Sequence, residues 1–430
     1  MVSWNLGRFF PEWPIELHRI RSTPPRLISS PATQPRRAAV SLILRVRPPE
    51  GLPAIPDYEP PPLAEFFQQD WVRHPGARAE LLFIRRDNQK PKEREMRGAG
   101  TGNAYGGAAA HVAFPGGRTE ESDEGALVHR QTWEEIGLDL AERDFTCVGQ
   151  LDDREITTSL GKRLLMILSP FVFLHLSPNE LHIDPPTDEP ETTLHWVPLS
   201  ALLSPTPKWA FVTVDISSRL APRHNILRTA VRWLVGSMRF RALVLTEADL
   251  HEMDDLHAHS FSHSMSRKDV IRSSASDELR LWGLTLGMTL DLIGFMYPRR
   301  TDLPPGDPSS DEFDEIGNMA MMPPMAYGAS SHSSVFPRFS IPDVNFWIWV
   351  FGRRYRTVLK AWEAAVLRSR VTLEGSATDR RINWSGQALS TFYAAVRKAL
   401  VVVIVGRAIG IVVSLVAVGV WIWKKMYPSV

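Results

Sequence analysis

The stretch His111–Leu138 reads HVAFPGGRTEESDEGALVHRQTWEEIGL and decides the fold of this 430-residue chain. It begins as a short apolar strand over His111–Phe114 and turns at Gly116 and Gly117. An acidic loop follows, and residues 125–136 then have the apolar spacing of a helix that ends at Gly137, a common helix-terminating residue. Glycines let the backbone turn sharply and expose amide groups to an anion. The stretch therefore predicts a strand, an anion-facing turn and a helix.

The predicted helix carries paired carboxylates. Gln131, Glu134 and Glu135 stand at i, i+3 and i+4, so their side chains share one face. Two adjacent carboxylates with a third oxygen ligand suit a hard divalent cation, Mg²⁺ in particular, which keeps several waters and bridges to phosphate oxygens. Arg130 lies four residues before Glu134 and can form an ion pair with it. This pattern predicts metal-assisted attack of water on a diphosphate.

These residues resemble a Nudix box. The positions that match its general pattern are Gly117, Arg130, Glu134, Glu135, Gly137 and Leu138. The preceding HVAFPGG is similar to the coenzyme A diphosphatase branch of that family, and the resemblance extends over roughly residues 37–298. It includes the strand Leu81–Arg86 on one side of the box, and Trp196–Leu199 and Leu281–Thr285 on the other.

The resemblance implies an α/β fold, a Nudix-type α/β/α sandwich with a mixed sheet. It also implies a hydrolase that uses Mg²⁺ or Mn²⁺ to cleave the diphosphate of coenzyme A or a related nucleoside diphosphate derivative. Glu134 and Glu135 would hold the metal, with Gln131 as a neutral ligand, and Arg130 would orient Glu134. On the substrate side, the resemblance assigns binding roles to Gly116, Gly117 and Arg85.

The chain departs from the family pattern at two points. Gln131 stands where the pattern has glutamate, and its amide can ligate a metal but cannot accept a proton from water at neutral pH. Gly117 and Arg130 are also one residue closer than in the general pattern, which leaves Ser122 or Asp123 where a glutamate is expected. Two alternatives stay open: a catalytically weakened nucleotide-binding or regulatory protein, and a membrane scaffold in which residues 346–430 carry the function.

The amino-acid composition excludes some classes of binding partner and metal site. Lys and Arg number 49 against 48 for Asp and Glu, a net charge of +1, which argues against nucleic-acid binding through overall positive charge. Cys147 is the single cysteine, so neither an intramolecular disulfide nor a cysteine-rich zinc site is expected. The compartment is expected to be reducing, and the Cys147 thiol is expected to pack in the core.

The C-terminal part contains one long apolar run. Residues 399–423 are apolar apart from Arg407, and Trp421, Trp423, Lys424 and Lys425 close the segment. About 20 apolar residues cross the hydrocarbon layer of a bilayer, so a transmembrane helix is predicted at 399–423, with Arg407 near enough to one end to reach the headgroups.

The flanks of this run predict its orientation. Arg380, Arg381, Arg397 and Lys398 precede it, and the positive-inside rule then places the main domain in the cytosol or an equivalent compartment. The first residues contain no apolar run typical of a secretory signal. A tail-anchored protein in an unspecified membrane is the prediction.

Five segments are predicted. They are a loosely ordered stretch at 1–36, a Nudix-like domain at 37–300, a disordered linker at 301–342, an amphipathic and basic helical region at 343–398, and the transmembrane helix at 399–423. Within them we expect helices at Gly125–Ile136, Leu199–Leu203, Ile226–Met238, Glu278–Phe295 and Phe346–Arg370. Besides the short strand at His111–Phe114, strands are expected at Ala38–Val46, Ala79–Arg86, Phe145–Leu151, Arg163–Leu176 and Thr193–Pro198.

Three further groups of polar residues are candidates for metal ligands. The histidines at 251, 257, 259 and 263, with Asp254 and Asp255, fit no standard zinc spacing and are typical of an exposed loop. Asp152–Glu155 is expected to be a solvated turn between strands rather than a source of an extra ligand. Asp188, Glu189 and Glu191 remain candidates for a distal carboxylate.

Overall fold

The computed structural model describes the following residues of the chain: 17, 20–22, 24–29, 36–49, 51–52, 55, 58–86, 111–119, 124–157, 164–179, 181, 183, 192–204, 207–215, 217, 225–246, 278–295, 336–358, 360 and 384–426. The predicted histidine group at 251–263, the carboxylates Asp188, Glu189 and Glu191, and the basic pair Arg380 and Arg381 lie outside these residues.

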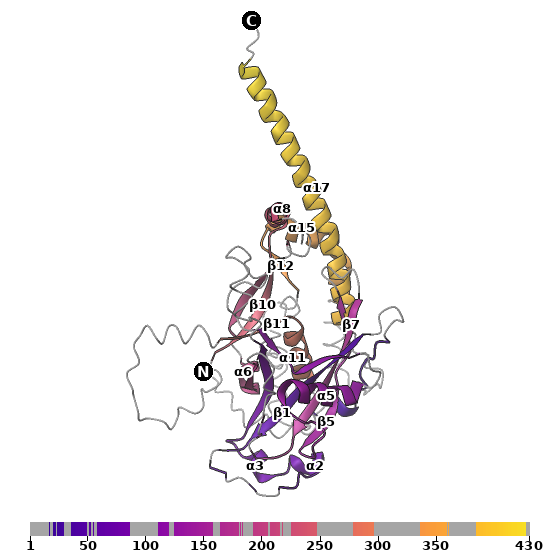
Figure 1. Ribbon diagram of the computed structural model, residues 1–430, viewed down its shortest axis with the longest axis vertical. Coiled ribbons are helices and arrows are strands. Elements are labelled where there is room, and N and C mark those ends of the chain that lie inside the picture. Colours follow the sequence, from indigo (N-terminus) through magenta and orange to yellow (C-terminus); the bar gives the residue numbers. More distant parts are fainter. Residues whose placement is uncertain are drawn as a thin grey trace, which may run out of the picture.

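One mixed sheet organises the described chain (Figure 1). Its main path runs β12-β10-β11-β3-β2-β1-β7-β5, while β4, β6, β8 and β9 pair with β1, β7, β2 and β10. The strands are β1 (Arg37–Arg47), β2 (Arg78–Arg86), β3 (His111–Ala113), β4 (Gly116–Thr119), β5 (Phe145–Gln150), β6 (Arg154–Thr157), β7 (Leu164–His175), β8 (Thr192–Pro198), β9 (Trp209–Val214), β10 (Met238–Leu245), β11 (Leu279–Trp282) and β12 (Arg338–Phe339).

The helices are α2 (Leu63–Phe66), α3 (Asp70–Arg73), α5 (Glu124–Ile136), α6 (Leu199–Leu202), α8 (Asn225–Val235), α11 (Gly283–Phe295), α15 (Pro342–Phe351) and α17 (Trp384–Met426). β1 pairs with β7 in parallel and β11 with β3 in parallel, whereas the other pairings are antiparallel. The prediction of an α/β protein with a mixed sheet is therefore confirmed.

Alternation along β1 separates two cores. Leu42 and Leu44 pack in a large cluster that includes Leu286 of α11. Ala39 and Ile43 point the other way and pack with Val128 of α5. Because successive side chains of a strand face opposite sides of its sheet, α5 and α11 lie on different faces.

A third core joins the C-terminal part of the chain to the sheet. Val235 and Met238 pack with Phe339, with Val344 of α15 and with Val396 of α17. β12 pairs with β10, although it lies inside the stretch predicted as a linker. The described residues of 336–403 therefore pack against the sheet as part of the same folded unit.

Two of the predicted helices are wrong in part. Residues 279–282 form β11, and the helix expected from Glu278 begins only at Gly283, which has a positive φ of 62°. Leu279 and Leu281 are buried and Arg280 and Trp282 less so, an alternation that suits a strand between β10 and β3. The helix expected to reach Met238 ends at Val235, because Gly236 (φ 74°) turns the chain into β10.

The C-terminal helices also differ from the prediction. α15 begins at Pro342 and ends at Phe351, and Gly352 interrupts the helix expected over Phe346–Arg370. α17 is 43 residues long, so it begins well before the predicted span at 399. Ala399, Leu400 and Val403 are buried in the third core. This part of the apolar run is a packed protein helix.

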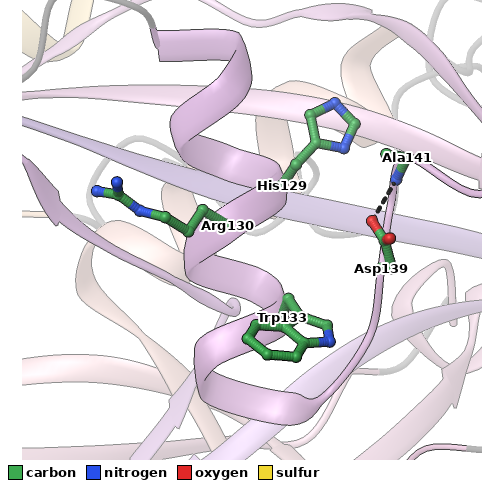
Figure 2. Close-up of a pocket in the computed structure, with 5 residues that line it drawn as sticks. All are labelled: His129, Arg130, Trp133, Asp139 and Ala141. Atoms are coloured by element: carbon green, nitrogen blue, oxygen red, sulfur yellow. Dashed lines mark hydrogen bonds between the residues drawn. The ribbon is translucent and has the colours of Figure 1, made fainter.

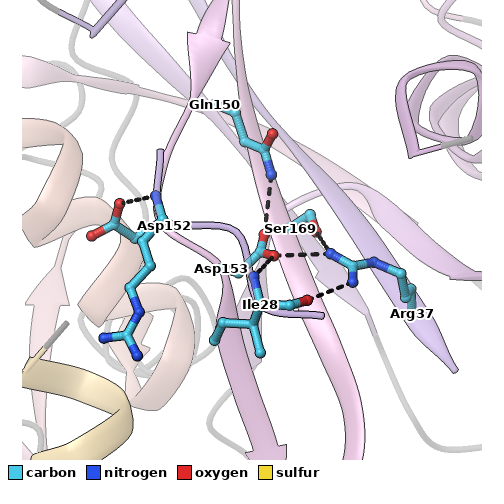
Figure 3. Close-up of polar contacts among 7 residues, drawn as sticks. Ile28, Arg37, Gln150, Asp152, Asp153 and Ser169 are labelled. Atoms are coloured by element: carbon cyan, nitrogen blue, oxygen red, sulfur yellow. Dashed lines mark hydrogen bonds and ion pairs between the residues drawn. The ribbon is translucent and has the colours of Figure 1, made fainter. Parts of the chain in front are cut away.

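Asp153 is buried, contrary to the solvated turn expected at Asp152–Glu155. Its carboxylate accepts hydrogen bonds from the Arg37 guanidinium at 2.9 Å, from the Ile28 backbone amide at 2.9 Å and from the Gln150 side chain at 3.0 Å (Figure 3). The next residue, Arg154, is also buried and pairs with Asp291 of α11. The charged side chains of Asp153 and Arg154 thus connect segments that are distant in sequence.

Part of the stretch predicted as loosely ordered packs against the sheet. Leu17 and Ile20 are buried in the large core, and Ile28 is bound to Asp153 as above. Cys147, in contrast, is exposed rather than packed in the core, although its strand neighbours Phe145 and Val148 are buried and the pairing of β5 with β7 is irregular between Cys147 and Gly149.

His175 at the end of β7 gives stability a pH dependence. The ring is buried beside Phe145, and desolvation, with a smaller repulsion from Arg45, lowers its pKa from 6.5 to about 4. The unfolded chain therefore binds the extra proton between these values, and stability falls as the pH drops from 6.5 towards 4, by about 3 kcal/mol.

Urea unfolding of the full chain in detergent at pH 7 and pH 4.5 measures this loss. His175→Phe is expected to flatten the pH dependence, whereas His74→Asn, which changes an exposed ring, should leave it as in the wild type. Equal slopes in the wild type and in His175→Phe would contradict the assignment.

Candidate functional site

The sheet holds α5 rigidly. Val128 and Ile136 are fully buried against it, and the buried Thr132 hydroxyl lies 3.0 Å from the Ser41 hydroxyl of β1. Ser41 in turn donates its backbone amide to the Pro115 carbonyl at 2.9 Å, just before the double glycine. The helix and the double glycine are therefore positioned by the same strand.

The turn predicted at Gly116 and Gly117 is wrong, because the chain bends at Pro115 and the two glycines begin β4, paired with β1. The first of them contacts a predicted metal ligand directly. The Gly116 backbone amide donates a hydrogen bond to Glu135 Oε2 at 2.8 Å. Gly116 has a φ of 146°, and a Cβ on it would lie 2.2 Å from the Ala39 carbonyl oxygen. Only glycine fits this position, so the requirement for glycine comes from the close approach of β1.

Gln131 occupies the space above the second glycine. A Cβ on Gly117 would lie 1.7 Å from Gln131 Oε1. The other end of that amide, Nε2, donates to Glu134 Oε2 at 2.9 Å, and Arg130 Nε lies 3.6 Å from Glu134 Oε1. Because the side chains of Arg130 and Glu134 are about half exposed, their ion pair contributes little to stability.

Six of the seven predicted site residues are thus brought together. They are Gly116, Gly117, Arg130, Gln131, Glu134 and Glu135. Arg85 differs, because it stands two residues after Phe83 and shares that residue's face of β2, whereas α5 packs on the side of Leu82 and Ile84. The structure does not bring Arg85 to the glutamates.

The cluster offers a small set of oxygen donors to a cation. Among the described residues, no group of three or more His, Cys, Asp and Glu side chains is placed to hold a metal ion. Glu134 and Glu135 supply two carboxylates and Gln131 an amide. Mg²⁺ in nucleotide enzymes is commonly held by one or two carboxylates together with waters and substrate phosphates, so these residues fit such an ion by their chemistry.

A pocket of about 490 Å³ lies beside α5 and was not predicted (Figure 2). His129, Arg130 and Trp133 line it from the helix, and Asp139 and Ala141 line it from the following loop. Trp133 is 59% exposed. The signal in the sequence is the apolar Trp133 one turn after His129, on a part of the helix that is otherwise polar.

The two glycines are expected to respond differently to alanine. Gly116→Ala meets backbone at Ala39 and should cost about 2–3 kcal/mol, because it combines an unfavourable φ with a steric clash. Gly117→Ala meets only the end of the flexible Gln131 side chain, which can rotate away, so a loss below about 1 kcal/mol is expected. Thermal unfolding of both variants measures the difference, and equal losses would contradict it.

No family model matches the chain. An uncharacterized protein of Schizosaccharomyces pombe is 31% identical over 140 residues, which are 32% of this chain and 41% of that relative. The aligned part thus spans about two fifths of the relative's length.

Solved structures with some likeness include hydrolases. A C. elegans Ap4A hydrolase binary complex is 13% identical, covering 46% of this chain and 96% of that one, with a TM-score of 0.21. A MutT/nudix family protein from Enterococcus faecalis is 11% identical, covering 64% and 73%, with a TM-score of 0.22. The T. brucei MERS1–RNA complex is 16% identical, covering 37% and 40%, with a TM-score of 0.20. At these scores the likenesses carry no conclusion about fold or function.

The class of protein is therefore defined by the structure at a general level. The chain is an α/β protein with a mixed sheet, a glycine at the start of β4 bound to a glutamate of a neighbouring helix, and a C-terminal helix long and apolar enough to cross a membrane.

Proposed function

We propose that the protein is a membrane-anchored, metal-dependent hydrolase that cleaves the diphosphate of coenzyme A or a related nucleoside diphosphate derivative. The observation that carries the proposal is the hydrogen bond between the Gly116 amide and Glu135, which joins the two halves of the Nudix-like motif. Glu134 and Glu135 would hold Mg²⁺ or Mn²⁺, with Gln131 as a neutral ligand. The ion supplies charge neutralisation on the diphosphate and activation of water.

The chain's own residues have defined tasks in this proposal. Gly116 fixes Glu135 against the start of β4, and Arg130 and Gln131 hold Glu134 from two sides. Gln131 cannot take a proton from water, so the reaction is expected to be slow unless another base acts. A nucleotide base or another apolar group of the substrate would find the exposed Trp133 ring in the neighbouring pocket.

The proposed division of the chain is revised accordingly. The catalytic unit would comprise the sheet with the packed parts of α15 and α17, because the third core is shared among them. We propose that the rest of α17 anchors this unit, with the main domain facing the cytosol or an equivalent compartment.

Gln131→Glu is the test of the metal site. The new carboxylate would replace the amide whose nitrogen now lies 2.9 Å from Glu134 Oε2, and like charges at such a distance repel unless a cation lies between them. The variant is therefore expected to lose thermal stability without metal and to regain it with Mn²⁺, by more than the wild type gains. It is also expected to hydrolyse its substrate about 10²-fold faster than the wild type or better, as a positioned general base contributes.

The assay uses the full chain in detergent or nanodiscs, with a panel of nucleotide diphosphates that includes coenzyme A, at high Mn²⁺. Glu135→Gln should abolish turnover, and the exposed Glu142→Gln, outside the cluster, should not. Absence of turnover in the wild type and in Gln131→Glu would refute the hydrolase.

A second candidate function is nucleotide binding without turnover. The hydrogen bond from Gln131 to Glu134 favours it, since the amide satisfies Glu134 with no cation present. Thermal stabilisation of the wild type by a nucleotide diphosphate, together with absent hydrolysis in both proteins, would select this function.

A further inference from the structure

The exposed part of α17 begins after Arg407. Val403 is buried, whereas every described residue from Ala408 to Met426 is exposed. Figure 1 shows this part of the helix leaving the molecule beyond α8 and α15. Arg407 binds both of these helices: it donates to the Leu234 carbonyl at the end of α8 at 2.7 Å and to Asp343 in the first turn of α15 at 2.6 Å.

This contact explains a charge that the sequence left inside the apolar run. The last carbonyls of a helix lack intrahelical donors and carry partial negative charge, so an arginine satisfies them well. Arg407 therefore belongs to the junction between the folded domain and the free helix rather than to the bilayer interior. The apolar span is shortened to residues 408–423, not 399–423.

The shortened span leaves no stretch of helix between the folded domain and the bilayer. Sixteen residues rise about 24 Å, less than the hydrocarbon thickness of about 30 Å. Arg407 at one end and Lys424 and Lys425 at the other can extend towards the headgroups and make up part of the difference. The end of the domain that carries α8 and α15 must then lie within the headgroup region itself.

That end carries three exposed aromatic side chains, which we call the aromatic platform: Trp233 at the end of α8 (82% exposed), Phe346 (56%) and Trp349 (61%) on α15. Phe346 and Trp349 stack on each other with ring centroids 6.5 Å apart, and the Arg356 guanidinium lies over Trp349 at 4.7 Å. Trp421 and Trp423, both more than 60% exposed, lie at the far end of the span. Aromatic residues gather in this way at both surfaces of a bilayer.

The charges around the platform match an anionic lipid surface. Arg232, Arg353 and Arg354 are exposed, and Asp343 is the acidic residue within the described 336–358 and is bound to Arg407. Basic side chains near a membrane surface are attracted to anionic headgroups.

The geometry points to a membrane-docking surface: the aromatic platform inserts into the headgroup region of the bilayer that α17 crosses, on the side of the folded domain. The domain would thus be held at two places, by α17 and by the platform, with a fixed orientation. The inference rests on the part of the proposed function in which α17 spans a membrane, and it is independent of hydrolysis.

Site-specific fluorescence tests the inference. In the full chain with Cys147→Ser, single cysteines replace Phe346, Trp349, Leu415 or Trp133 and carry an environment-sensitive fluorophore. The protein is reconstituted into phosphatidylcholine vesicles with a minority of phosphatidylserine, in which some lipids carry a nitroxide quencher either near the headgroup or deep in the acyl chain. Trp133 is the matched control, as an equally exposed aromatic residue on α5.

Labels at 346 and 349 are expected to lose most of their emission to the shallow quencher, and the label at 415 to the deep one, while the label at 133 keeps its emission. If 415 is quenched but 346 and 349 behave like 133, the anchor stands and the docking surface is refuted. If 415 is not quenched, the membrane anchor fails and the docking surface with it. Blue-shifted emission at 346 and 349 that neither quencher reduces would indicate a protein partner there and would also refute the inference.

Discussion

Asp153→Ala is expected to lower the free energy of unfolding by about 3 kcal/mol, because it leaves the Arg37 guanidinium, whose side chain is only 13% exposed, without its partner carboxylate. The side chain has no exposed surface and accepts hydrogen bonds from Ile28 and Arg37, which lie more than a hundred residues away, and from Gln150, three residues before it. Denaturant unfolding of the full chain measures the loss.

Asp152→Ala is the matched control for Asp153→Ala. Its carboxylate accepts a hydrogen bond from the Arg26 amide in an exposed position, so removal should cost about 1 kcal/mol or less. Asp153→Asn retains an acceptor and should fall between the two. Similar losses in Asp152→Ala and Asp153→Ala would show that burial at this turn has no energetic consequence and would contradict the prediction.

A fragment limited to residues 37–300 is expected to aggregate rather than fold. It lacks Leu17 and Ile20 from the large core, and it lacks the segments that cover Val235 and Met238 in the third core. Each large side chain that loses its cover costs about 1.5–3 kcal/mol, and a domain of this kind has only about 5–15 kcal/mol in total.

The fragment 1–407 provides the comparison. It keeps all three cores and the Arg407 contacts and removes only the exposed part of α17. Size-exclusion chromatography and thermal unfolding are expected to show a folded protein for 1–407 and aggregates for 37–300. A folded, cooperative 37–300 fragment would mean that the third core is dispensable for the sheet.

Local patterns predicted the central elements well. The strands at 37–47, 78–86 and 164–175 and the helix at 124–136 agree with their predicted bounds within one or two residues. Their apolar periodicity reflects burial on one or both faces, which is a local property of the sequence. The six clustered residues of the candidate site were predictable for the same reason, since they lie within one short strand–turn–helix unit.

The misassigned elements depend on partners far away in the chain. Leu279–Trp282 is a short, largely apolar stretch that suits a helix or a strand equally, and pairing with β10 and β3 makes it a strand. Asp153 was expected in water because its donors at Ile28 and Arg37 are more than a hundred residues away. Cys147 was expected inside because a single strand residue next to apolar neighbours does not reveal its face.

The amino-acid sequence by itself determined the mixed α/β character, the glutamate-bearing helix after a double glycine, and an apolar segment near the C-terminus, because each is encoded by residues close together in the chain. The tertiary structure alone decided that Glu135 meets the Gly116 amide, that Arg85 faces away from the glutamates, and that Arg407 binds α8 and α15 at the edge of the folded domain. These three depend on which surfaces meet when distant segments bury their apolar faces together, and no local pattern contains that information.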